Sequence, residues 1–187
     1  MLLAHQTDTH VLDPDGETEN HLLDNNRRLA LAGERITQET VPPRAVLATG
    51  VLTDHCTEVE TKLLLDLLAP LSALGAPLLV VPGNHDDRAR FHEAFDLPWA
   101  SPSNLSWMVD IDDLRIIGLD TIIPGSHGGR FDEERRAWLT AALDDVIMIQ
   151  LTGFNFLATV GVHPFHVAPL KLNLPAGWFT TSEIVSL

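Results

Sequence analysis

The chain has 187 residues with a formal net charge of −14, and 45% of its residues are hydrophobic, which is typical of one globular domain with a sizeable core. The acidic balance argues against nucleic-acid polymers as partners, because they require a basic surface, although bound metal ions could still attract a small phosphate ester. A single cysteine excludes an intrachain disulfide, and no segment is typical of a signal peptide or a membrane span. We therefore expect a cytoplasmic protein without a membrane partner.

Short apolar segments alternate with amphipathic segments along the first part of the chain. In chain order, the sequence predicts a strand at 2–7, a helix at 21–40, a strand at 45–49, a helix at 57–74, a strand at 76–81, a helix at 87–95, a hairpin around Asp112 and Asp113, and a helix at 131–143. Strands that alternate with helices favour a largely parallel sheet with right-handed crossovers, and thus an α/β fold.

Each of the three predicted strands ends in a polar loop: "TDTH", "TGVLTDH" and "PGNHDD". The carboxyl ends of parallel strands meet at one edge of the sheet, where open α/β sheets bind ligands. Seven residues could therefore share one site: Asp8, His10, Asp54, His55, Asn84, His85 and Asp86. A plain turn is the alternative for the third loop, because Pro, Gly, Asn and Asp are common turn residues.

The residue types in these loops suit metal chemistry. In a strand the side chains at i and i+2 share a face, so Asp8 and His10 could bind one ion together. A carboxylate and an imidazole suit Zn, Mn, Fe or Co better than Ca. Asn84 adds a carbonyl oxygen, and His85 could act as a general acid or donate to a phosphoryl oxygen. The alternative for His85 is a structural hydrogen bond.

Ser126 and Cys56 are the other candidate nucleophiles in the sequence. "GSHGG" lacks the spacing of a hydrolase nucleophile turn around Ser126, so residues 124–129 are interpreted as a loop. Cys56 beside His55 could form a thiolate pair, but a buried or incidental cysteine is favoured.

The segment from Val146 onward has a different composition. It contains only two charged residues, Lys171 and Glu183, so the whole net charge belongs to residues 1–145. We expect residues 146–187 to be buried, either as part of the same domain or as a contact in a homo-oligomer, because an apolar surface of this size is unusual on a soluble monomer.

Taken together, the three loop motifs resemble those of the calcineurin-like metallophosphoesterases. "LLAHQTDTHV", "AVLATGVLTD" and "PLLVVPGNHDDRARF" are most similar to the branch of class III cyclic-nucleotide phosphodiesterases and bacterial glycerophosphodiesterases. The resemblance covers residues 1–145. It implies a layered α/β sandwich, shortened on its C-terminal side, and metal-dependent hydrolysis of a small phosphodiester, either a cyclic nucleotide or a glycerophosphodiester.

The resemblance also implies a site with two divalent transition-metal ions. The positions of Asp8 and His10 correspond to ligands of the first ion, and that of Asn84 to a ligand of the second. His85 corresponds to a catalytic histidine that stabilises charge or protonates the leaving group. The ions would supply a hydroxide near neutral pH and stabilise the attacking and leaving oxygens.

The sequence departs from the family pattern in two places. Val51 occupies the position of the aspartate that bridges the two ions, and Asp54 is the nearest carboxylate. The later Gly-His-x-His motif is absent, and "VGVHPFH" offers His163, or less favourably His166, as one late ligand. One ion or none is therefore an alternative to two. The competing functions are a single-metal esterase with a rebuilt site and a catalytically impaired module for binding or assembly.

Overall fold

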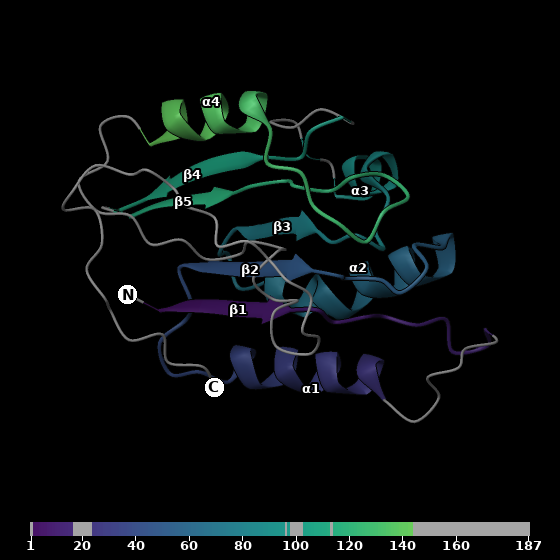
Figure 1. Ribbon diagram of the computed structural model, residues 1–187. Coiled ribbons are helices and arrows are strands. Elements are labelled where there is room, and N and C mark those ends of the chain that lie inside the picture. Colours follow the sequence, from purple (N-terminus) through teal and green to yellow (C-terminus); the bar gives the residue numbers. More distant parts are fainter. Residues whose placement is uncertain (1, 17–23, 96, 98–102, 113, 144–187) are drawn as a thin grey trace, which may run out of the picture.

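The computed structural model describes residues 2–16, 24–95, 97, 103–112 and 114–143 (Figure 1). The elements in chain order are β1 (Leu3–Thr7), α1 (Asn25–Thr37), β2 (Ala45–Gly50), α2 (Glu58–Ser72), β3 (Leu78–Pro82), α3 (Arg88–Ala94), β4 (Trp107–Ile111), β5 (Leu114–Gly118) and α4 (Glu133–Ala142). This order confirms the predicted α/β alternation. The expected segment at 146–187 lies outside the described residues and stays a prediction.

The helices begin where side chains cap them. Asp24 accepts a hydrogen bond from the Arg27 amide, so α1 begins after it and is shorter than the predicted 21–40. Thr57 and Glu60 form a capping box at the start of α2, in which each side chain bonds the other residue's backbone. Within the described part of the chain, no helix combines the length and apolarity needed to cross a membrane.

The three predicted strands form one parallel sheet in the order β1-β2-β3. Thr7 lies opposite Thr49, and Gly50 lies opposite Pro82, so all three strands end at the same edge. β4 and β5 form the predicted antiparallel hairpin, in which Trp107 pairs with Gly118. The Trp107 indole lies where a Cβ at position 118 would be, and its Nε1 donates to the Val80 carbonyl, which joins the hairpin to β3.

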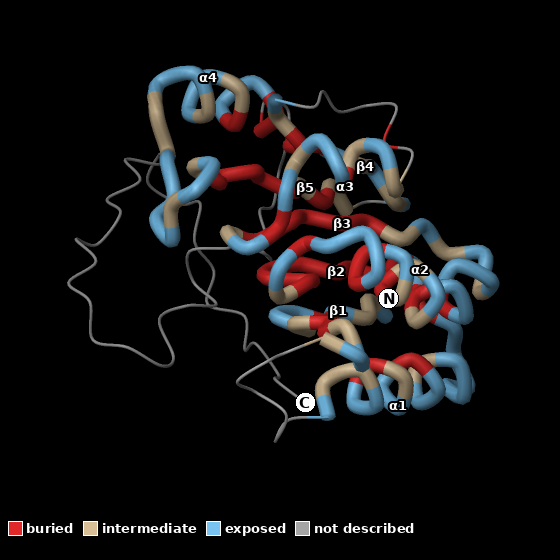
Figure 2. Tube along the Cα trace, turned by 90° about the vertical axis from the view of Figure 1, so that its right-hand side faces the viewer, coloured by how far each residue is buried: buried red, intermediate tan, exposed pale blue. Residues whose placement is uncertain are grey.

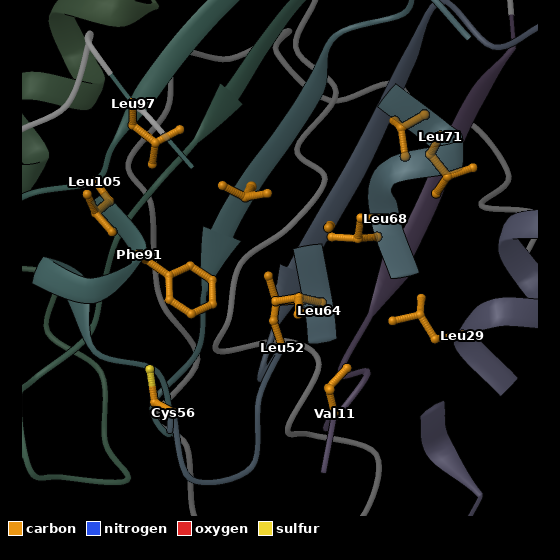
Figure 3. Packing of buried hydrophobic residues seen from close by; sticks show 13 residues of the cluster. Val11, Leu29, Leu52, Cys56, Leu64, Leu68, Leu71, Phe91, Leu97 and Leu105 are labelled. Carbon is orange, nitrogen blue, oxygen red and sulfur yellow. The ribbon is translucent and has the colours of Figure 1, made fainter. Parts of the chain in front are cut away.

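The core lies on both faces of this sheet. One face packs against α1 and α2 through buried leucines, which Figure 3 shows together with neighbouring side chains. On the other face, Leu47, Leu79 and Val81 pack with Trp107 and Ile116 of the hairpin. β2 is buried along its whole length between these layers (Figure 2). The sheet is therefore a rigid support for the loops at its carboxyl edge.

One polar side chain in this core, that of Gln6, lacks hydrogen-bond partners among the described residues. Gln6 is 8% exposed, and neither its amide nitrogen nor its amide oxygen has a hydrogen-bond partner among the described residues. It lies on the same face of β1 as Ala4, which packs against the α1–α2 side of the core. Burial of an amide without partners costs free energy that an apolar side chain would not.

We expect Gln6→Leu to raise the free energy of unfolding by about 1–3 kcal/mol, because it removes a buried amide that has no partner in the part of the chain that the structure describes. Urea unfolding followed by circular dichroism measures the change. Gln38→Leu, at the exposed end of α1, is the matched control and should change stability by less than about 0.5 kcal/mol. Equal or lower stability of Gln6→Leu would contradict this account of Gln6.

Candidate functional site

The loops that follow β1, β2 and β3 are in backbone contact with one another. A Cβ at Gly50 would lie 2.5 Å from Oδ1 of Asp8, and the Val51 amide donates to the same oxygen at 3.1 Å. A Cβ at Gly83 would lie 2.5 Å from the Val51 nitrogen. Real Cβ atoms do not approach so closely, and at Gly83 the obstacle is backbone, so glycine is needed there for the loops to meet. At Gly50 the Asp8 side chain could move, but a φ of 80° favours glycine.

Asp8 and His10 are placed by the loop rather than by strand alternation. β1 ends at Thr7, and both residues have left-handed backbone conformations, with φ of 52° for Asp8 and 42° for His10. The premise that the two side chains share a strand face is therefore wrong. Their amides instead donate to the carbonyls of Thr49 and Val51. Strained backbone of this kind costs about 1–3 kcal/mol per residue and is concentrated at functional sites.

Asp54 connects two of the predicted site histidines. Its Oδ1 lies 2.8 Å from Nδ1 of His10, and its main-chain oxygen lies 2.8 Å from Nδ1 of His85. The centroids of the two imidazole rings are 5.7 Å apart, and the rings meet edge to face. Because both Nδ1 atoms donate to oxygens, the Nε2 atom of each ring is left for other partners. A carboxylate that orients a histidine in this way is common behind metal ligands.

A third histidine, His127, lies in the loop predicted at residues 124–129 and joins this group. Nδ1 of His127 lies 3.2 Å from Nδ2 of Asn84, and its ring lies 5.6 Å from the ring of His85. Thus residues that follow β1, β3 and β5 meet at the edge where the sheet ends. The only local signal for His127 is its glycine-rich setting, which predicts a turn and gives no indication of its partner.

Asp86, one of the residues predicted to share the site, has structural partners instead. Asp86 is 6% exposed and accepts hydrogen bonds from the Leu52, Thr53 and Gly83 amides and from the Thr53 hydroxyl. These buried bonds link the loop after β3 to the loop after β2. Burial raises the pKa of its carboxyl, an effect that these donors oppose.

His55 and Cys56 also have partners beside the site. Nδ1 of His55 lies 3.2 Å from the buried Glu60 carboxylate and 3.6 Å from Asp54. Burial raises the pKa of the Cys56 thiol, whose sulfur accepts from the Asp87 amide. This favours the interpretation of Cys56 as a buried cysteine rather than a thiolate.

The donor chemistry of the remaining residues fits a divalent transition metal. Asp8 offers carboxylate oxygens, His10 an imidazole nitrogen and Asn84 an amide oxygen. Over the described ranges, no three His, Cys, Asp or Glu side chains form a group that could hold an ion, so Asn84 would have to complete the set. Val51, at the expected bridging position, is 6% exposed. His163 and His166 lie outside the described residues.

The sequence pattern of the family described as calcineurin-like phosphoesterase matches residues 1–170. The chain belongs to this family. The resemblance inferred from the three loop motifs is thereby confirmed, and the parallel sheet with its flanking helices agrees with the predicted fold class.

Curated relatives are phosphodiesterases. The chain is 36% identical over 143 residues to a cAMP/cGMP dual specificity phosphodiesterase of Mycobacterium tuberculosis, an alignment that covers 76% of this chain and 45% of the relative. It is 32% identical over 146 residues to a probable glycerophosphodiester phosphodiesterase of Arcobacter nitrofigilis (77% and 52%). It is 31% identical over 147 residues to a 3′,5′-cyclic adenosine monophosphate phosphodiesterase of Pseudomonas aeruginosa (77% and 50%). The chain spans about half the length of these relatives.

Proposed function

We propose that the chain binds one or two divalent transition-metal ions through Asp8, His10 and Asn84 and hydrolyses a small phosphodiester, either a cyclic nucleotide or a glycerophosphodiester. The observation that carries the proposal is the double contact of Asp54, which joins His10 and His85 where the sheet ends. The activities for which these relatives are named support the substrate class. Homo-oligomer formation, the absence of nucleic-acid partners and a cytoplasmic location remain predictions.

The hydrogen bonds suggest a role for each side chain. With Nδ1 of His10 on Asp54, its Nε2 would be the metal-binding atom. A bound ion makes hydroxide available near neutral pH and stabilises charge on phosphoryl oxygens. Nδ1 of the exposed His85 ring donates to the Asp54 main-chain oxygen, so in the imidazolium form, with both nitrogens protonated, the ring could pass the Nε2 proton to the leaving oxygen.

One observation favours a second candidate. The valine at position 51 supplies no anion between two cations, and repulsion between two ions without a bridging anion is strong. A single-metal esterase, or a module that binds a phosphodiester without turnover, is therefore the alternative. His163 would add a ligand only if the segment after residue 143 reaches this edge of the sheet.

The proposed function is tested by metal binding and turnover in the full chain. We expect Mn²⁺ binding, followed by electron paramagnetic resonance, and Mn²⁺-dependent hydrolysis of bis-p-nitrophenyl phosphate, cyclic AMP or a glycerophosphodiester. Asp8→Ala should weaken both. His85→Ala should lower turnover about 10²–10⁴-fold with metal affinity unchanged, as expected for a general acid.

His92→Ala, on α3, is the matched histidine control and should retain both properties. Binding without turnover would support the module for binding or assembly. No metal binding at all would overturn the proposal.

A further inference from the structure

Asn84 is the candidate ligand whose side chain has two different ends. Only the amide oxygen can bind a cation, because the amide nitrogen carries two protons and no lone pair suited to a metal. Which end faces the site therefore depends on what holds the nitrogen. In the structure, Nδ2 of Asn84 lies 3.2 Å from Nδ1 of His127. Since an amide nitrogen can only donate, Nδ1 of His127 is the acceptor, and the neutral ring carries its proton on Nε2.

We propose that His127 is a positioning residue that holds the amide nitrogen of Asn84 and so turns the amide oxygen toward the candidate metal site. The proposal rests on the proposed function. The oxygen and nitrogen of a carboxamide occupy opposite branches of one planar group. Fixing the nitrogen on His127 thus directs the oxygen away from the loop that carries His127. Neighbours that orient a ligand in this way usually change metal affinity 10–100-fold, as an order of magnitude.

The loop that carries His127 is closed by its own hydrogen bonds. Ile122 and Gly129 form an antiparallel bridge, and the Arg130 amide donates to the Thr121 carbonyl at 2.7 Å. At the tip, Ser126 Oγ accepts from the Gly128 amide at 3.1 Å. These bonds restrain the backbone on both sides of His127.

The same loop is fastened to the Asn84 loop at its base. Arg88, which opens α3 four residues after Asn84, pairs with Asp120 through two guanidinium nitrogens and donates to the Ile122 carbonyl. Asp120 is fully buried and also accepts from the Ile122 amide. The two loops are therefore joined at the base by an ion pair and at the tip by the Asn84–His127 contact.

Two substitutions at position 127 separate positioning from general structure. In His127→Asn, the side-chain oxygen is bonded to Cγ, as Nδ1 is in histidine, so an acceptor is kept at the same place. His127→Leu removes the acceptor and replaces the ring with an apolar side chain of similar length. We expect His127→Leu to weaken Mn²⁺ binding by about 10–100-fold and His127→Asn to restore most of the loss.

A second measurement does not depend on metal. Nitrogen NMR of the metal-free protein, above the pH range in which histidine titrates, should show Nδ1 of His127 without a proton and Nε2 with one. The Asn84 side-chain amide signal should shift in His127→Leu and remain near its original position in His127→Asn.

A proton on Nδ1 of His127, or wild-type Mn²⁺ affinity in His127→Leu, would overturn the proposal. Loss of affinity in both variants would also overturn it, because the acceptor atom would then be irrelevant. Failure of the wild-type protein to bind Mn²⁺ would instead overturn the proposed function. In that case the NMR result alone would decide whether His127 holds the Asn84 amide.

Discussion

Asp120→Ala is expected to lower the free energy of unfolding by about 3–5 kcal/mol, the usual loss when one partner of a buried ion pair is removed. The Asp120 side chain is 0% exposed and that of Arg88 is 10% exposed, so the substitution leaves a buried guanidinium without its counter-ion. It also leaves the Leu105 and Ile122 amides without an acceptor. Urea unfolding followed by circular dichroism measures the effect.

Three further variants test this prediction. Asp120→Asn keeps the shape and part of the hydrogen bonding, so it should lose less stability than the alanine variant. Replacing both partners, with Arg88→Met and Asp120→Leu, should recover part of the loss because no buried charge remains. Asp110→Ala removes the partner of Arg115 in an exposed pair and should change stability little. Wild-type stability of Asp120→Ala would show that the pair contributes nothing to holding the two loops together.

The sequence was sufficient to predict the sheet and the edge at which the site lies. Apolar segments of strand length alternate with amphipathic segments, and this pattern leaves few alternatives to a parallel sheet. Once β1 and β3 are parallel neighbours of β2, the "DTH" and "GNHDD" motifs must follow strands that end together. The proximity of His10 and His85 follows from this topology.

The orientation of individual polar residues could not be predicted in the same way. Asn84, His85 and Asp86 are adjacent, but Asp86 turns inward to four donors while His85 is exposed. His127 reaches Asn84 because an ion pair joins Arg88 to Asp120, which lie 32 positions apart in sequence. Neither orientation can be predicted from a periodic pattern in the local sequence, because both depend on contacts between loops.

Val51→Asp is expected to raise Mn²⁺ affinity at least about tenfold, equivalent to about 1.4 kcal/mol, because it adds an anion next to Asp8. The Val51 amide already donates to the Asp8 carboxylate, so position 51 adjoins the candidate ligand. The valine is 6% exposed, and a carboxylate there would be costly without a cation. The metal-free variant should therefore unfold at a lower temperature than the wild type.

Addition of Mn²⁺ should reverse that order, because an ion that binds only the folded state stabilises it by an amount that increases with its affinity. Calorimetric unfolding with and without Mn²⁺ measures both effects without an assay of turnover. Val51→Asn is the matched control: it buries a polar group of the same shape but adds no charge, so Mn²⁺ should stabilise it less. Equal responses of the two variants would mean that charge at position 51 does not limit binding. The limiting ligands would then have to come from other parts of the chain, and the late histidine His163 would be the next residue to replace.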